Sequence, residues 1–274
     1  MHEGWFLIET SGDAPTVLMV GSRTKQWRPV SNVFRGSVYS VVQQLVETVM
    51  NNLKQSQVLL EGPRLALAHP VLGPARQVHA ILMWIGDSTV LPPPAPRVHS
   101  WAWDLADRVS PILVDDPEGR TMTDWLSGCA RIGDVLCTLT DVRRAELGDR
   151  FAGEWVRVDG VVHRYALRSV ATFDGPRLVG VSVELPEALP AGHAELLPRS
   201  ALEFSCDHHG TAMAVVDGAT RRAQAWLTDR VPGCDPAVRS GRSAAPPATR
   251  LLDLESIGSL LAVFECVDGS SRWG

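Results

Sequence analysis

The sequence predicts an α+β fold in which antiparallel sheets are flanked by a few helices. Short runs of β-branched and aromatic residues, separated by Gly, Asp and Pro, recur along the chain and are typical of strands joined by tight turns. One long segment near the N-terminus instead repeats its apolar residues at helical spacing. With 274 residues, 45% of them hydrophobic, the chain can bury the cores of two domains or of three small ones.

Residues 1–90 have the pattern of a first module. The runs "GWFLIET" (4–10) and "PTVLMVG" (15–21) predict two strands of a hairpin. A helix is expected over residues 31–57, with Ser31 as its N-cap, and "RLALAHPVLGPARQVHAILMWIGD" returns to strand character on either side of a Gly-Pro turn. The apolar face of this helix consists of Phe34, Val38, Val42, Leu45, Val49 and Leu53.

Residues 91–97, "LPPPAPR", contain four prolines and cannot continue a helix or a central strand. They predict an extended, semi-rigid linker between two modules. A proline-rich ligand for an SH3 or WW domain is the alternative interpretation of the same residues.

Residues 98–186 predict a second module. Alternation in "VHSWAWDL" places Trp101 and Trp103 on one face of a strand, which we expect to face the core. The stretch 121–150 suggests short helices crossing a sheet. Residues 154–185 form three β-rich runs separated by Asp-Gly pairs, which predicts an antiparallel meander.

This second segment, opening on "WAWDLADR" and closing on "VDGVVHRYALRSVATFDGPRLVGVSVEL", resembles a PAS domain. The chain as a whole, from "GWFLIETSGDAP" through "VHAILMWIGDSTVLPPPAPRVHSWAWDL", resembles an actinobacterial family of sensor-domain-only proteins. That resemblance implies tandem, divergent GAF- and PAS-type modules without an effector domain. It also implies that residues 187–274 form a third, shortened module, in which the Pro-, Gly- and Ser-rich segment 232–250 is expected to be a mobile loop.

Composition narrows the classes of partner and compartment. A formal net charge of -5 argues against nucleic-acid binding, which needs clustered basic residues. The longest apolar runs are too short to span a membrane. The sequence has five cysteines and no CxxC pair, and its N-terminus lacks the basic and apolar stretches of a signal peptide. We therefore predict a cytoplasmic protein with reduced thiols.

Few residues suggest reaction chemistry. Cys206, His208 and His209 could contribute zinc ligands, but a tight turn between strands explains "CDHH" equally well, so no metal or other cofactor is expected. Phosphate-loop, dinucleotide-binding, zinc-protease and nucleophile-elbow motifs are missing from the sequence. We therefore predict that the protein is not an enzyme and name no catalytic residue.

The predicted function is that of a non-enzymatic signalling or scaffold protein that binds a small-molecule ligand, a protein partner, or both. Trp27, flanked by Lys25 and Arg28, is the candidate for an exposed anchor of a partner. The alternative is a purely structural interaction module whose pockets are filled by its own side chains. Homodimer formation through the long helix is left open, because covering its own sheet would satisfy the same apolar stripe.

Overall fold

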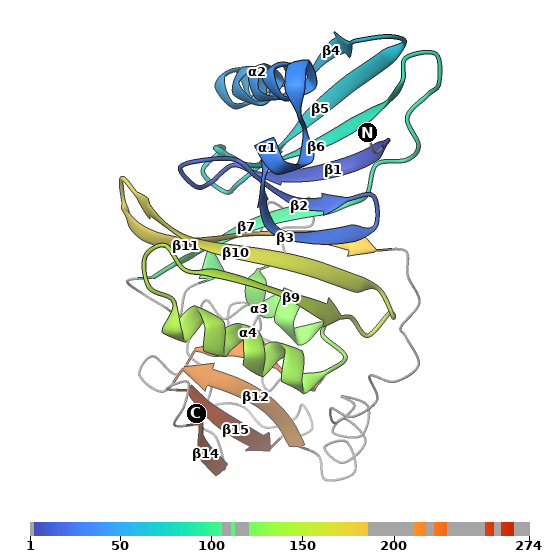
Figure 1. Cartoon of the computed structure of the whole chain (residues 1–274). Coiled ribbons are helices and arrows are strands. Elements are labelled where there is room, and N and C mark those ends of the chain that lie inside the picture. The colour runs from blue at the N-terminus through green and yellow to red at the C-terminus, as the bar shows by residue number, and fades with distance from the viewer. Residues whose placement is uncertain are drawn as a thin grey trace.

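A computed structural model describes residues 3–105, 111–112, 121–185, 211–217, 222–228, 250–254 and 259–265. Their strands form three sheets, stacked one below another with helices between and above them (Figure 1). All the described strand pairs are antiparallel, which confirms the predicted α+β class. No helix in the described ranges is long and apolar enough to cross a membrane.

The first sheet has six strands in the order β3-β2-β1-β6-β5-β4, and helix α2 covers one of its faces (Figure 1). The apolar side of α2 packs on residues such as Phe6, Ile8 and Ile85, forming a closed core. The bounds are β1 Gly4–Glu9, β2 Thr16–Val20, β3 Arg23–Pro29, α1 Val30–Val33, α2 Gly36–Asn52, β4 Ser56–Leu60, β5 Arg64–Leu72 and β6 Val78–Asp87.

The helix predicted over residues 31–57 is wrong at both ends. Phe34 adopts an extended conformation and separates the single turn of α1 from α2, which begins at Gly36 with Arg35 rather than Ser31 as its N-cap. Leu53 ends the helix in the left-handed region, at a φ of 56°, and its side chain is exposed. The apolar repeat continues beyond the helix at both ends, so periodicity alone overestimated its length.

The second sheet has five strands in the order β8-β7-β11-β10-β9, and helices α3 and α4 lie against the face turned away from the first sheet (Figure 1). Trp101 and Trp103 face this helical side and are buried, as their alternation predicts. The bounds are β7 Val98–Asp104, β8 Pro111–Ile112, α3 Met122–Ser127, α4 Ile132–Arg144, β9 Arg150–Val156, β10 Val162–Thr172 and β11 Gly175–Leu185.

The third sheet, in the order β13-β12-β15-β14, shares its core with the second. Val215, Ala225 and Leu227 belong to the same apolar cluster as Trp101, and the Trp226 amide donates to Ser127 Oγ at 2.7 Å. Of the loop expected over 232–250, residues 232–249 lie outside the described residues and Arg250 begins β14. The bounds are β12 Thr211–Asp217, β13 Ala223–Trp226, β14 Arg250–Leu254 and β15 Ser259–Glu265.

The three sheets share one topology. In each sheet the strand that comes first along the chain pairs with the strand that comes last along the chain, as β1 with β6, β7 with β11 and β12 with β15. Apolar side chains of β1 and β6, including Trp5 and Leu82, pack face to face on Val181 and Val183 of β11. Apolar packing therefore continues from the first sheet through the second to strands β12 and β13 of the third.

Candidate functional site

The space between the second sheet and helices α3 and α4 is where a PAS-like module would hold a ligand, and its own aromatic side chains occupy it. Trp101 and Trp155 are each 1% exposed, with ring centroids 5.6 Å apart. Tyr165 stacks on Trp155 at 4.4 Å, and the Trp155 indole donates to Thr138 Oγ1 at 2.8 Å. Because the Trp155 indole is hydrogen-bonded and the three rings pack together, this part of the second module is a filled core.

The facing surfaces of the first and second sheets carry buried polar groups at one end. Arg168 Nη2 donates to Glu9 Oε2 at 2.9 Å, and these side chains are 9% and 4% exposed. Glu9 also accepts from the Ser11 amide and from Thr16 Oγ1. The ion pair therefore connects β10 to β1 across the interface between the sheets.

A second polar contact crosses the same interface. His79 of β6 lies with its Nδ1 2.7 Å from Ser100 Oγ of β7. Burial, assisted by the charge of Arg177, lowers the pKa of His79 from 6.5 to about 4. The imidazole is thus neutral at physiological pH.

Trp27, the predicted partner anchor, is half-buried at the edge of this interface. The Arg168 and Arg150 guanidinium carbons lie 5.0 and 5.5 Å from its ring centroid. The residue adopts a positive φ of 49°. Its ring therefore contacts two arginines of the second sheet, and a role in binding a partner stays a prediction.

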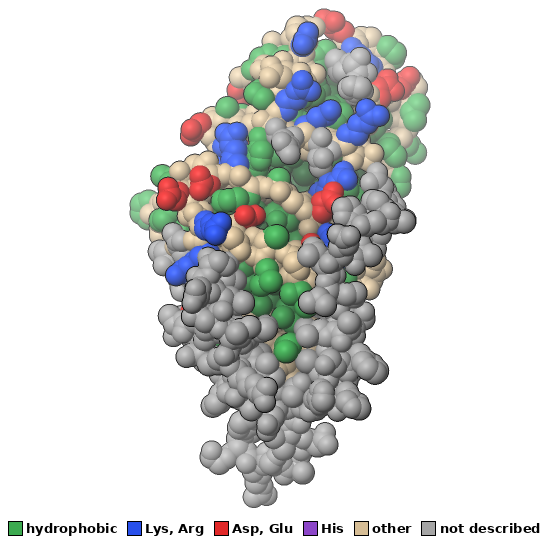
Figure 2. All heavy atoms as spheres, turned by 60° about the horizontal axis from the view of Figure 1, so that its bottom comes forward, with side chains coloured by type: hydrophobic (Ala, Val, Ile, Leu, Met, Phe, Trp, Pro, Cys, Tyr) green, Lys and Arg blue, Asp and Glu red, His purple; other side chains and the backbone are tan. Residues whose placement is uncertain are grey.

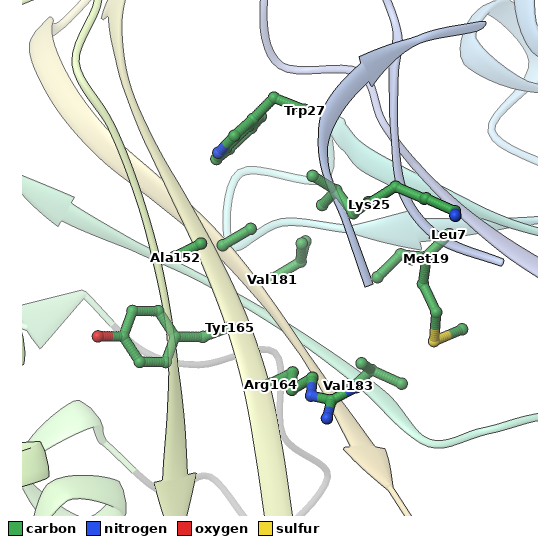
Figure 3. A pocket seen from close by; sticks show the side chains of 11 residues that line it. Leu7, Met19, Lys25, Trp27, Ala152, Arg164, Tyr165, Val181 and Val183 are labelled. Carbon is green, nitrogen blue, oxygen red and sulfur yellow. The ribbon is translucent and has the colours of Figure 1, made fainter. Parts of the chain in front are cut away.

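Beside Trp27 the two sheets enclose a small, mostly apolar hollow of about 50 Å³, shown in Figure 3. Trp27, Lys25 and Met19 line it from the first sheet; Ala152, Tyr165, Val181 and other residues line it from the second. Its volume suits one or two water molecules rather than a ligand.

Next to this hollow lies a groove of about 510 Å³ at the edge of the same interface, and Met19 lines both. Arg164 Nη1 donates to the Ser22 carbonyl at 3.0 Å between the two. The groove is lined by Trp5, Met19, Gly21 and Ser22 of the first module, Pro94, Pro96 and Arg97 of the linker, and Val161, Glu184 and Leu185 of the second module. Its size lies within the range of small-molecule sites.

The linker forms one wall of this groove. Residues 91–97 contain no helix or strand, and the Trp5 indole donates to the Pro93 carbonyl at 3.2 Å. An indole that donates to the carbonyl of a proline-rich segment is typical of aromatic grooves that bind such segments. The prolines thus have an intramolecular contact, and recognition by an SH3 or WW domain stays untested.

The charged groups of the groove are Arg97 and Glu184. The Arg97 side chain is 80% exposed, and its Nε lies 3.9 Å from Glu184 Oε2. The other oxygen, Oε1, lies 3.3 Å from His99 Nε2. His163 completes a group whose ligand atoms all lie within 4.8 Å of one another.

The metal candidates named from the sequence, Cys206, His208 and His209, lie outside the described residues. Sequence reasoning missed the cluster of His99, His163 and Glu184 because these residues meet only through the register of three strands. A signal did exist, since His99 lies on the same strand face as Trp101. Which residues oppose it could not be read from the sequence.

On the face drawn in Figure 2, Lys and Arg side chains lie mainly over the N-terminal sheet, and Asp and Glu side chains lie among them. Mixed charge of this kind does not distinguish the surface from that of an ordinary globular protein. The prediction that nucleic acid is not a partner stays untested.

Fold and groove together define a layered α+β protein whose ligand-sized groove lies between two sheets. Residues 4–94 of the chain match the model of a family described as "Rv3651-like, N-terminal". This segment contains the whole first sheet and most of the linker. The similarity therefore covers the first module and one part of the groove.

Over nearly its full length the structure is similar to the crystal structure of an uncharacterised protein from Mycobacterium tuberculosis. The TM-score is 0.71 at 16% sequence identity, covering 98% of this chain and 97% of that one. A shared fold with an actinobacterial protein is thereby shown, which supports the coarser part of the predicted resemblance. The assignment of modules as GAF or PAS stays a prediction.

A further comparison is with the periplasmic sensory domain of the Campylobacter jejuni chemoreceptor Tlp1. It gives a TM-score of 0.23 at 12% identity, covering 66% of this chain and 72% of that one. A score this low does not indicate a shared fold. No curated protein matches the chain.

Proposed function

We propose that this protein is a non-enzymatic, cytoplasmic signalling protein of sensor-like modules without an effector domain, and that its ligand occupies the groove between the first two sheets. One observation carries the proposal: the first sheet, the linker and the second sheet all contribute walls to the same ligand-sized groove. An occupant would contact all three segments at once. The recurrence of one strand plan in all three sheets supports the tandem-module part of the proposal.

The lining of the groove suggests the chemical class of its ligand. Trp5, Met19, Pro94, Pro96, Val161 and Leu185 offer apolar surface. Arg97 is the cation of the lining, and its largely exposed guanidinium approaches Glu184 only loosely, at 3.9 Å. We therefore expect a small molecule with an apolar body and one anionic group, the latter paired with Arg97.

Binding would act by shifting a conformational equilibrium. An occupant that fits the groove better when the linker is docked on Trp5 stabilises the arrangement described here. Its effect cannot exceed the difference between its affinities for the docked and undocked states. Helix α2 lies on the far face of the first sheet and would not contact the occupant.

A structural module with self-filled pockets is the second candidate function. The packed rings of Trp101, Trp155 and Tyr165 favour it, because they leave the helical side of the second sheet filled. In that case the groove would hold only solvent, and the protein would act through its outer surface.

Two fluorescent probes of similar shape distinguish these functions. The first, 1-anilinonaphthalene-8-sulfonate, carries a sulfonate, and the second, N-phenyl-1-naphthylamine, is neutral. We expect saturable binding of both to the folded chain. Val161→Glu, which places a carboxylate in the apolar lining, should weaken both affinities at least ~10-fold.

The matched control is Val158→Glu, because Val158 is 60% exposed on the neighbouring turn and does not line the groove. It should leave both affinities unchanged. Arg97→Gln should weaken binding of the sulfonate probe by about 5-fold, as expected for loss of one exposed charge pair, and leave the neutral probe unaffected. Equal affinities in wild type and Val161→Glu would contradict the groove and favour the structural module.

A further inference from the structure

Three strands of the second sheet bring two imidazoles and a carboxylate together. His163 of β10 lies directly opposite Glu184 of β11, and His99 of β7 lies opposite Ser182, two residues before Glu184. Alternation along the strands places all three side chains on the face that carries Trp101. Their ligand atoms lie within 4.8 Å of one another.

The surroundings hold both imidazoles in place. The Trp125 ring of α3 contacts both edge-on, with centroids 4.8 Å from His99 and 4.9 Å from His163. Arg97 lies nearest the carboxylate oxygen that faces away from His99. The two contacts with Trp125 restrict the orientation of both imidazole rings.

Access to the cluster is graded. His163 is 1% exposed, whereas the His99 and Glu184 side chains are 14% and 25% exposed. An ion could therefore enter from the side of His99 and Glu184 and be held against the buried His163. A solvent path of this kind is a requirement for metal exchange.

We propose that His99, His163 and Glu184 form a binding site for a divalent transition-metal ion of the zinc type. Two imidazole nitrogens and one carboxylate oxygen are a donor set that Zn²⁺ and Co²⁺ accept readily, whereas Mg²⁺ and Ca²⁺ prefer oxygen alone. Ligand atoms about 2 Å from a tetrahedral ion lie roughly 3.4 Å apart. Side-chain rotations that move the ligand atoms by about an ångström would therefore bring them to coordinating distances. Three protein ligands leave one coordination position for water or another small ligand.

The site goes beyond the proposed function and does not depend on a ligand in the groove. It also differs from the candidates Cys206, His208 and His209, because it contains no sulfur ligand. The two tests fail separately, since one measures binding of organic probes and the other binding of a metal.

Titration with Co²⁺ tests the site. The full chain, freed of metal with a chelator, should bind one Co²⁺ with visible d–d bands typical of low coordination number, and Zn²⁺ should displace it. Co²⁺ should also quench a component of tryptophan fluorescence that is absent from Trp125→Phe.

His163→Gln and Glu184→Gln should each weaken Co²⁺ binding at least ~10-fold. Glu184→Gln serves if the buried His163→Gln variant does not fold. His69→Gln is the matched control, because His69 is a half-buried strand histidine in β5, outside the cluster. Absence of binding, unchanged affinity in both cluster variants, or a sulfur-to-cobalt charge-transfer band would overturn the proposal.

Discussion

Single residues connect the first two sheets through buried charge. The Arg168 guanidinium reaches Glu9 across the interface and lies against the backbone of Gly12, where any side chain would collide with it. Trp27 covers the same guanidinium from the edge. Because both side chains are nearly buried, each charge is stabilised by the other in place of water.

We therefore expect Arg168→Met to destabilise the protein by about 3–5 kcal/mol, because it leaves the Glu9 carboxylate buried without its counter-ion. The double variant Glu9→Gln/Arg168→Met should be less destabilised than Arg168→Met alone. Urea denaturation followed by circular dichroism measures both. A double variant less stable than the single one would show that the charge of Glu9 is not the cause of the loss.

For single residues, the sequence predicted which side chains are buried better than it predicted which residues they contact. Alternation correctly placed Trp101 and Trp103 in a core, because that inference needs only the geometry of one strand. Trp27 was expected to be exposed, since its neighbours in the sequence are basic. The arginines that cover it come from β9 and β10, more than a hundred residues away, and no local pattern reveals them.

At the scale of elements, the linker and the neighbouring strands decide how the modules meet. Four prolines correctly predicted a segment without helix or strand, and the Trp5 contact shows where it docks. The amphipathic stripe of α2 is buried on its own sheet, which accounts for it within a single chain. A dimer stays a prediction, and any dimer would have to use other surfaces.

Burial of a neutral His79 between β6 and β7 should make the stability of the fold sensitive to acid, because the unfolded chain takes up a proton at His79 at a higher pH than the folded chain does. The folded pKa of about 4 lies below the ordinary 6.5, so the neutral imidazole contributes stability above pH 6.5 that is lost as the pH falls toward 4. The loss attributable to His79 should reach about 2 kcal/mol by pH 5.

The difference in unfolding free energy between pH 7 and pH 5, measured for wild type and His79→Gln, isolates this contribution. The variant should lose less stability over that range, because glutamine does not titrate. An identical loss in both proteins would assign the acid sensitivity to other groups.

For the whole molecule, face-to-face packing of the sheets determines where a ligand can bind. A sensor-like module would hold a ligand between its sheet and its helices, but in the second module Trp101, Trp155 and Tyr165 fill that space. The groove instead depends on how two modules stack and on the linker that crosses their edge. The sequence could predict the elements and the linker but not this stacking, because the stacking of two modules leaves no pattern in the apolar periodicity of either module.

A ligand bound in the groove between the first two sheets would lie beside Trp5, so the indole N–H resonance of Trp5 reports on its binding directly. Two-dimensional ¹H–¹⁵N NMR of the nine tryptophans, with Trp5 assigned through Trp5→Phe, can follow titration with 1-anilinonaphthalene-8-sulfonate. We expect the Trp5 resonance to shift until binding saturates, while those of Trp101 and Trp155 stay in place. Shifts of the Trp101 and Trp155 resonances without a shift of the Trp5 resonance would place the ligand in the helical core of the second module and contradict binding in the groove.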